Sequence, residues 1–319
     1  MKKILLFIAA IVSLYSCTKE ELPAVSVGLS EWSYELKTHE QVRKGIKSIT
    51  INKYSVEEKF GKQEKYLEES IVANYNKEGR IINCDNSEYE YIYYDNNKIK
   101  TIICYNFDSE HTEIISKIVN EFNEKGYLIK DIGYNENGIP SYPNWEHQYD
   151  EKGRIIETNG ITYRSEPCKI NYIYNEKGWV TEETTYESGS ISQVKAYKYD
   201  KKGNCIEKIE YDSEGNVDSK VVFEHRGRNT VTATVYDGDG NMKYKTEYTP
   251  DETISYDESG GIDERIVFKN KYPVEMNSDI HICRIEYNKK GDCVKMTTYY
   301  LYEGKENVNA VTECEYTYY

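Results

Sequence analysis

The sequence predicts an all-β fold: a long antiparallel meander of hairpins, curled into an open or closed barrel-like sheet after an N-terminal signal peptide. One observation is a repeat, since an aromatic residue followed by Asp or Asn, two further residues and Gly recurs ten times. Another is that no helical periodicity competes with this repeat after the signal peptide. The copies begin at Tyr75, Phe122, Tyr134, Tyr149, Tyr174, Tyr199, Tyr211, Tyr236, Tyr256 and Tyr287.

The chemistry of the repeat predicts a tight hairpin turn. Asp or Asn suits the first position of a type I turn, and Gly three residues later takes the left-handed conformation that closes a hairpin with a bulge. In that geometry each aromatic residue faces the residue six positions after itself. These ten positions are all apolar: Ile81, Leu128, Pro140, Ile155, Val180, Cys205, Val217, Met242, Ile262 and Cys293. Degenerate copies begin at Tyr94 and Tyr186.

The spacing of the repeats sets the length of the strands. Steps of 12 or 13 residues leave about eight residues of strand between turns, so each strand begins just after a glycine and ends at the next tyrosine. Pairing from about Ile46 to Tyr318 gives some twenty strands, and a sheet that long curls, splits or closes. In the strand of residues 241–248, alternation predicts Met242, Tyr244 and Tyr248 on one face, opposite Lys243, Lys245 and Glu247.

The first residues of the chain look like a lipoprotein signal. Residues 1–16 combine Lys2 and Lys3 with an apolar run that is too short to span a membrane. The tetrad Leu14-Tyr15-Ser16-Cys17 resembles a lipobox, which predicts that Cys17 is acylated, for example with palmitate, and tethers the protein to the membrane. We therefore expect a signal peptide at 1–16, a lipidated tether at 17–45 and a β domain at 46–319.

Charge and motifs narrow the possible functions. The chain carries a formal charge of −14, and no cluster of Lys and Arg suits phosphate, so nucleic acid is not expected as a partner. An acidic surface tolerates neutral or cationic partners such as glycans. The five histidines and the seven cysteines beyond Cys17 have no metal-site spacing, and an odd number of thiols cannot all pair. No catalytic residue, metal site or cofactor is predicted, and disulfide pairing stays open.

The repeat also resembles a known family. Tyr149-Asp150-Glu151-Lys152-Gly153-Arg154-Ile155 is similar to the YD repeat of the RHS family, although other copies replace the Arg. The chain as a whole resembles short Bacteroidetes lipoproteins of unknown function that are built from such repeats and have a porin-like β fold. The acidic residues after Cys17 resemble those of lipoproteins in this group. The resemblance implies an outer-membrane location with display on the cell surface.

One pattern within the repeats predicts a candidate ligand-binding face. Glu157, Glu182 and Glu207 are spaced 25 residues apart, each eight positions after a motif tyrosine. On alternate strands they would stand about 10 Å apart. We expect them to share a face with the motif tyrosines Tyr149, Tyr174 and Tyr199 and with Tyr172 and Tyr197. Such a face would suit sugar rings or a cationic group, unless the tyrosines serve only cross-strand packing.

Three functions remain open from the sequence. The leading hypothesis is an envelope-anchored, non-enzymatic module that binds a glycan or a protein. The second is a polysaccharide hydrolase, whose paired carboxylates would need to stand about 5–10 Å apart. The third is a structural shell or spacer without a ligand.

Overall fold

The computed structural model describes residues 45–59, 62–85, 87–108, 113–161, 166–226, 230–270, 272–278, 281–302 and 305–319. The predicted signal peptide, the lipidation site at Cys17 and all of the tether except residue 45 lie outside these residues. The first strand begins at Ile46, where the β domain was expected to begin.

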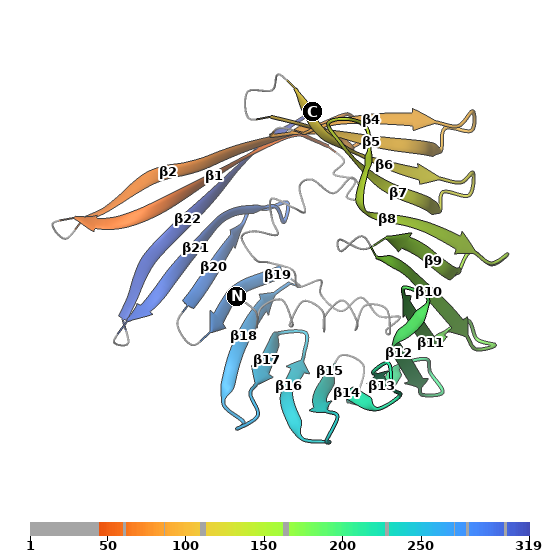
Figure 1. Ribbon diagram of the computed structural model, residues 1–319. Helices are drawn as coiled ribbons and strands as arrows, with labels where there is room; N and C mark the ends of the chain where they lie inside the picture. Colours follow the sequence, from red (N-terminus) through yellow and green to blue (C-terminus); the bar gives the residue numbers. More distant parts are fainter. Residues whose placement is uncertain are drawn as a thin grey trace. The chain divides into compact units, whose positions relative to one another are not determined.

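The prediction of an all-β antiparallel meander is confirmed. The described residues form 22 strands in one hydrogen-bonded sheet and no helix (Figure 1). The strands are β1 (Ile46–Lys59), β2 (Lys62–Tyr75), β3 (Ile81–Cys84), β4 (Ser87–Tyr93), β5 (Ile99–Phe107), β6 (Ile114–Phe122), β7 (Leu128–Asn135), β8 (Pro140–Tyr149), β9 (Ile155–Ile161), β10 (Pro167–Tyr174), β11 (Val180–Glu187), β12 (Ser190–Tyr199), β13 (Cys205–Tyr211), β14 (Val217–Arg226), β15 (Thr230–Asp237), β16 (Met242–Tyr248), β17 (Glu252–Tyr256), β18 (Ile262–Lys269), β19 (Tyr272–Ser278), β20 (His281–Tyr287), β21 (Cys293–Tyr302) and β22 (Lys305–Tyr318).

The β domain contains two compact units. One comprises Ala73–Tyr197 and Ile209–Asp218, and in it β3 to β12 pair with their neighbours in chain order. The other comprises the described residues up to Val72, Lys198–Lys208 and Ser219–Tyr319. In this second unit the strands from β14 to β22 likewise follow the chain.

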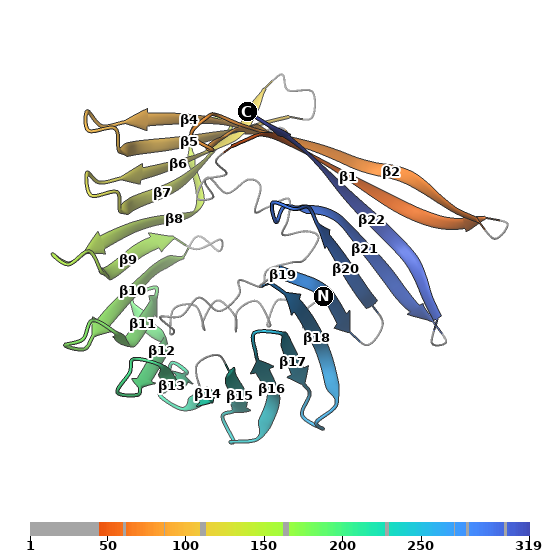
Figure 2. The same ribbon diagram turned by 180° about the vertical axis from the view of Figure 1, so that it is seen from behind.

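The first and last strands are paired with each other in this second unit. Residues 46–55 of β1 run antiparallel to β22, with Ile51 opposite Cys314 and Tyr54 opposite Val311. β1 also pairs with β2, and the three strands lie side by side in both views (Figure 1 and Figure 2). Ile49 and Ile51 are each only 1% exposed, which makes β1 part of the core of its unit.

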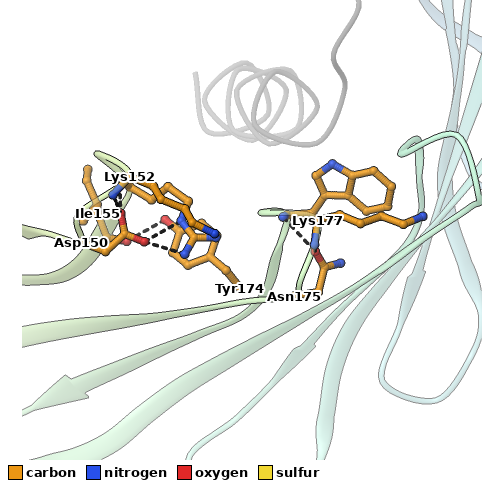
Figure 3. A network of polar contacts seen from close by, with 8 residues as sticks. Asp150, Lys152, Ile155, Tyr174, Asn175 and Lys177 are labelled. Carbon is orange, nitrogen blue, oxygen red and sulfur yellow. Dashed lines mark hydrogen bonds and ion pairs between the residues drawn. The ribbon is translucent and has the colours of Figure 1, made fainter.

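The turns have the predicted geometry, as the hairpin that follows Tyr149 illustrates (Figure 3). Gly153 has a φ of +81°, and its N–H donates to the Asp150 carbonyl at 3.0 Å. One carboxylate oxygen of Asp150 accepts the backbone N–H groups of Lys152 and Arg154, each at 2.9 Å. In the turn, the N–H groups of Lys152 and Arg154 have no partner in the strand ladder, and the Asp150 carboxylate provides one. This role explains why Asp or Asn is preferred at this position.

The register of the hairpins confirms the expected pairings wherever the structure gives them. Each motif aromatic faces the residue six positions later in the pairs Tyr75–Ile81, Phe122–Leu128, Tyr134–Pro140, Tyr149–Ile155, Tyr174–Val180, Tyr236–Met242, Tyr256–Ile262 and Tyr287–Cys293. The ladder shifts by a residue immediately beside most of these pairs, so a bulge accompanies the turn.

This bulge makes the predicted alternation in β16 partly wrong. Met242 faces Tyr236, whereas Tyr244 faces the adjacent residue Val235, so Lys243 is an extra residue. Because directly opposite residues share a face, Met242 lies on the face opposite that of Tyr244 and Tyr248. The extra residue reverses the alternation, which a count along the sequence misses.

The two degenerate repeats also differ from expectation. The turn assigned to Tyr94 begins one residue earlier, because Tyr93 is the residue that faces Ile99, and Asn97 takes the positive φ of the usual glycine. At Tyr186 the connection is a two-residue turn, in which both Ser188 and Gly189 have positive φ. That conformation is typical of a type I′ hairpin, and the ladder again shifts by a residue beside Tyr186.

Candidate functional site

The hydroxyl groups of several tyrosines bind backbone carbonyls at the bulges. Tyr149 donates to the Leu128 carbonyl and Tyr174 to the Ile155 carbonyl, each at 2.6 Å. Tyr91 donates to Ile81 at 2.9 Å, and Tyr316 donates to Cys293 at 2.8 Å. Each acceptor belongs to the residue that faces a motif aromatic across its turn. A bulge disrupts the ladder at this position, and the tyrosine of the next strand binds the carbonyl there.

A histidine takes the same position once. His225 Nε2 lies 2.8 Å from the carbonyl oxygen of Cys205, which is the residue six positions after the motif tyrosine Tyr199. His225 is on β14 and Cys205 begins β13. A neutral imidazole with its proton on Nε2 can donate this bond. The recurring feature is therefore a side-chain donor at the bulge.

The arginine of the repeat packs on the same tyrosines. The Arg154 guanidinium lies 4.5 Å from the ring centre of Tyr174 and also binds the Asp150 carboxylate (Figure 3). Arg80 stands in the same way over Tyr91, at 5.6 Å. The backbone N–H of Arg154 and its side chain, in that order, hold the pKa of Asp150 below its usual range. Asp, Gly, Arg and the tyrosine of the next strand thus form one structural unit.

The structure corrects the face on which two of the predicted glutamates lie. Glu157 faces Gln148, whereas the adjacent Tyr149 faces Ile155, so Ile156 is the extra residue of the bulge. Glu157 therefore lies on the face opposite that of Tyr149. Glu182 likewise faces Ile173, while Tyr174 faces Val180. The two glutamates share a face with each other and not with the motif tyrosines.

Glu207 and Tyr199 belong to the other compact unit. Glu207 forms ion pairs with Lys198 and with Lys220, the latter at 2.7 Å. These two lysines, Lys198 first, lower the pKa of the Glu207 carboxyl. The predicted row of three glutamates is thus divided between the two units, and only Glu157 and Glu182 belong to one unit.

The tyrosine face of β10 to β12 carries a different glutamate, Glu183. Glu183 is directly opposite Tyr172, and the hydroxyl of the buried Tyr197 donates to its carboxylate at 2.9 Å. Burial, followed by the charge of Glu183, raises the pKa of Tyr172. Counting the bulge as an extra residue would have identified Glu183 from the sequence. Its carboxylate is engaged with the sheet's own tyrosine.

The opposite face of β8 to β10 holds a connected set of polar side chains, which we name the Glu157 ladder: Gln148, Glu157, Asn159 and Lys169. The carboxylate of Glu157 accepts from Gln148 Nε2 at 3.1 Å and from Asn159 Nδ2 at 2.6 Å, and Lys169 Nζ lies 2.6 Å away. Lys169, followed by Asn159, lowers the pKa of Glu157. Asn171 is opposite Glu157 and Tyr186 is opposite Lys169, so both extend this face.

The chemistry available on this face is hydrogen bonding. Amides, a carboxylate and an ammonium group provide both donors and acceptors, and the ladder is only partly buried. Ile173 adds an apolar contact, since it lies on the same face as Glu182 and is 53% exposed. In the part of the chain that the structure describes, no three His, Cys, Asp or Glu side chains are grouped to hold a metal ion.

None of the described segments forms a helix long and apolar enough to cross a membrane.

Comparisons with known proteins return solved structures alone. No family model matches the chain, and no curated protein matches it. The chain is similar to a porin-like protein from Bacteroides uniformis ATCC 8492, with 10% identity over 86% of this chain and 96% of that chain and a TM-score of 0.33. A porin-like protein from Bacteroides vulgatus ATCC 8482 has 9% identity, coverage of 86% and 99%, and a TM-score of 0.25.

A third similar structure is described as TcdB2-TccC3-TEV. It has 11% identity over 96% of this chain but only 24% of that chain, with a TM-score of 0.16. The relation to the YD repeat of the RHS family stays a prediction.

Proposed function

We propose that this chain is a non-enzymatic interaction module of the bacterial envelope, anchored by a lipid on Cys17, which binds a glycan through the Glu157 ladder. The observation that carries the binding proposal is the ladder itself, in which amide, carboxylate and ammonium groups are connected on a partly exposed sheet face. Sugar hydroxyls both donate and accept hydrogen bonds, so a mixed set of this kind matches them. A protein ligand is the alternative partner for the same face.

The tyrosine face, which the sequence nominated, is less suited to a ligand. The hydroxyl of Tyr174 is bonded to the Ile155 carbonyl, and Arg154 stands over its ring. Tyr197 is buried and bonded to Glu183. Stacking on a sugar requires an accessible ring face, and these tyrosines use their ring or hydroxyl within the sheet. We therefore assign the ligand to the opposite face.

The hydrolase alternative is weakened by the charge environment of the carboxylates. A glycosidase needs one carboxyl group that stays protonated, which requires a raised pKa. Lys169 lowers the pKa of Glu157, and Lys198 and Lys220 lower that of Glu207. Both carboxyls are thus held as anions, which suits an acceptor of hydrogen bonds and not a general acid.

A structural shell or spacer is the second candidate, and one observation favours it. Tyrosines of the repeat bind bulge carbonyls, so their abundance has a purely structural explanation. The binding module and the spacer can be distinguished by experiment, because only the binding module has a ligand for the Glu157 ladder.

Binding is tested on a glycan array with the full chain solubilised in detergent. We expect Asn159→Ala and Lys169→Ala to reduce binding about fivefold or more, because each removes a direct contact worth about 1–3 kcal/mol. Lys53→Ala is the matched control, since Lys53 forms a similar ion pair with Glu69 in the other unit. Binding that is absent, or that responds equally to all three changes, would favour the spacer.

The anchor is tested separately from the ligand. We expect palmitate labelling of the wild-type protein in cells and its loss in Cys17→Ser, with the variant leaving the membrane fraction. Surface display predicts that protease added to intact cells removes the wild-type protein. A labelled protein that resists protease would place the anchor on the inner side of the outer membrane.

A further inference from the structure

Three of the described cysteines gather in one part of the sheet. Cys283, Cys293 and Cys314 lie on β20, β21 and β22, which are neighbouring strands of the same unit. All three are buried, with exposures of 9%, 5% and 6%. Cys283 and Cys293 belong to an apolar cluster with Ile285 and Met296.

Cys293 and Cys314 are the pair that the strand register brings together. Lys295 of β21 is directly opposite Glu313 of β22, Cys314 is the next residue of β22, and Cys293 lies two residues before Lys295, beside the extra residue Val294. Cys293 faces Tyr287 while Lys295 faces Glu286 and Glu313, so the bulge brings Cys293 to the same face of the sheet as Cys314. The two cysteines thus lie on one face of neighbouring strands, one residue out of direct register.

Cys283 is less suited to pair with either of them. It faces Met276 on one side and Thr298 on the other, whereas Cys293 faces Tyr287. Burial raises the pKa of the Cys283 thiol to about 11. The register therefore favours the pair between β21 and β22, with Cys283 left as a buried thiol.

We propose that Cys293 and Cys314 form a disulfide bond in the exported protein. The oxidant is a disulfide, carried by a small molecule or by a thiol–disulfide oxidoreductase. One protein thiolate attacks it to give a mixed disulfide, and the second thiolate displaces the remaining sulfur. Two protein S–H bonds and the S–S bond of the oxidant are replaced by one protein S–S bond and two thiols of the oxidant, which take both protons.

The packed environment of Cys293 lowers the reactivity of its thiol. The Cys314 thiol, followed by burial, raises the pKa of Cys293 above its ordinary value. Because the thiolate is the reactive form, the packed sheet suppresses exchange at Cys293. Once formed, the buried bond is therefore protected from reductants.

The test is a disulfide map of the full chain after refolding in a buffer of reduced and oxidised glutathione. Free thiols are alkylated in denaturant, and the protein is digested with trypsin without reduction. Cleavage after Lys290, Lys295 and Lys305 leaves Cys293 in residues 291–295 and Cys314 in residues 306–319, each as the only cysteine of its peptide. We expect these two peptides to be joined, and Cys168, a buried thiol of the other unit, to be alkylated.

A second measurement tests the bond in the folded protein. Reductant present during refolding is expected to lower the melting temperature of the wild-type protein by several degrees, and to leave that of Cys314→Ala unchanged. Cys168→Ala is the control and should respond as the wild type does. Recovery of both peptides in alkylated form, or a link between Cys293 and Cys283, would overturn the proposal. If Cys314→Ala fails to fold, the peptide map of the wild-type protein decides the question alone.

Discussion

The hairpins that follow Tyr149 and Tyr174 have the same backbone but different side chains (Figure 3). Gly153 and Gly178 have φ values of +81° and +82°. Asp150 and Asn175 each use one side-chain oxygen to accept the backbone N–H groups two and four residues later. The Asp150 carboxylate and the Asn175 amide thus form equivalent hydrogen bonds. The turn requires only an acceptor oxygen at this position and a residue that tolerates positive φ, here glycine, three positions later.

The residue after the glycine is where the two hairpins diverge. Arg154 packs on Tyr174 of the neighbouring strand, whereas Trp179 takes the equivalent position and is covered by Lys177 at 4.6 Å. The difference teaches that a repeat contains two kinds of positions. Some serve its own turn and tolerate only chemically equivalent residues, while others serve the adjacent strand and vary with it.

The largest expected effect comes from filling the space beside the glycines. A Cβ at Gly153 would stand 2.2 Å from the Tyr127 hydroxyl oxygen, but at Gly178 the nearest atom is Arg154 Nη1 at 3.4 Å. Both alanine variants pay about 1–2 kcal/mol for the left-handed conformation. Gly153→Ala also displaces Tyr127 from its stack on Tyr149, so we expect it to cost about 1 kcal/mol more. Urea denaturation followed by fluorescence measures both, and equal losses would contradict the comparison.

The next effect concerns the bulge carbonyl. Tyr174→Phe removes the hydroxyl that donates to Ile155, and we expect a loss of about 0.5–1.5 kcal/mol in the free energy of unfolding. The control is Tyr302→Phe, because the Tyr302 side chain is mostly exposed. A Tyr174→Phe protein as stable as the control would show that the hydroxyl is dispensable.

Exchange of the residue after the glycine should have a smaller effect. Arg154→Ala loses the contact with Tyr174 and the ion pair with Asp150, which together are worth about 0.5–1 kcal/mol at an exposed site. Trp179→Arg should be nearly neutral, since its turn does not depend on that side chain. Thermal unfolding of the two variants provides the measurement, and a larger loss for Trp179→Arg would reverse the interpretation.

The smallest effect at neutral pH is expected for Asp150→Asn, which copies the Asn175 turn. Because the pKa of Asp150 is lowered in the folded state, the stability that this carboxylate contributes is present above its unfolded pKa of about 3.9 and is lost as the pH falls through its folded pKa. The difference between wild type and Asp150→Asn should therefore vanish in acid. Melting temperatures measured from pH 7 down to about pH 2 test this, and a difference that persists in acid would assign it to another cause.

The turns and their pairings could be predicted because they are local. The turn depends on three residues close to Tyr149: Asp150 with its acceptor oxygen, Gly153 with its positive φ, and the apolar Ile155. Sequence spacing alone therefore determines that Tyr149 faces Ile155. The face of Glu157 could not be predicted by alternation, because Ile156 is an extra residue that reverses every later position in β9. The partners of Glu157 were also missed, since Lys169 lies on the next strand.

The roles of the tyrosines depend on contacts across strands. Tyr174 is a motif residue of its own turn, but its hydroxyl binds the bulge of the preceding hairpin at Ile155. The repeat pattern shows that the tyrosine and the bulge both recur, but it does not show that the tyrosine hydroxyl binds the carbonyl at the bulge of the preceding hairpin. The sequence left open whether the first and last strands pair, and the register of β1 against β22 could not be predicted, because the paired residues are far apart in sequence and no repeat marks β1.

That pairing constrains the order in which the chain can fold. During synthesis and export β1 emerges first, yet the strand that completes its hydrogen bonds arrives last. For that interval one edge of β1 is an open template for strands of other molecules, the situation in which intermediates aggregate. Contacts between such distant segments also slow folding. Because the first strand pairs with the last, we expect folding to need a chaperone that shields this edge or to show a slow final step in refolding kinetics.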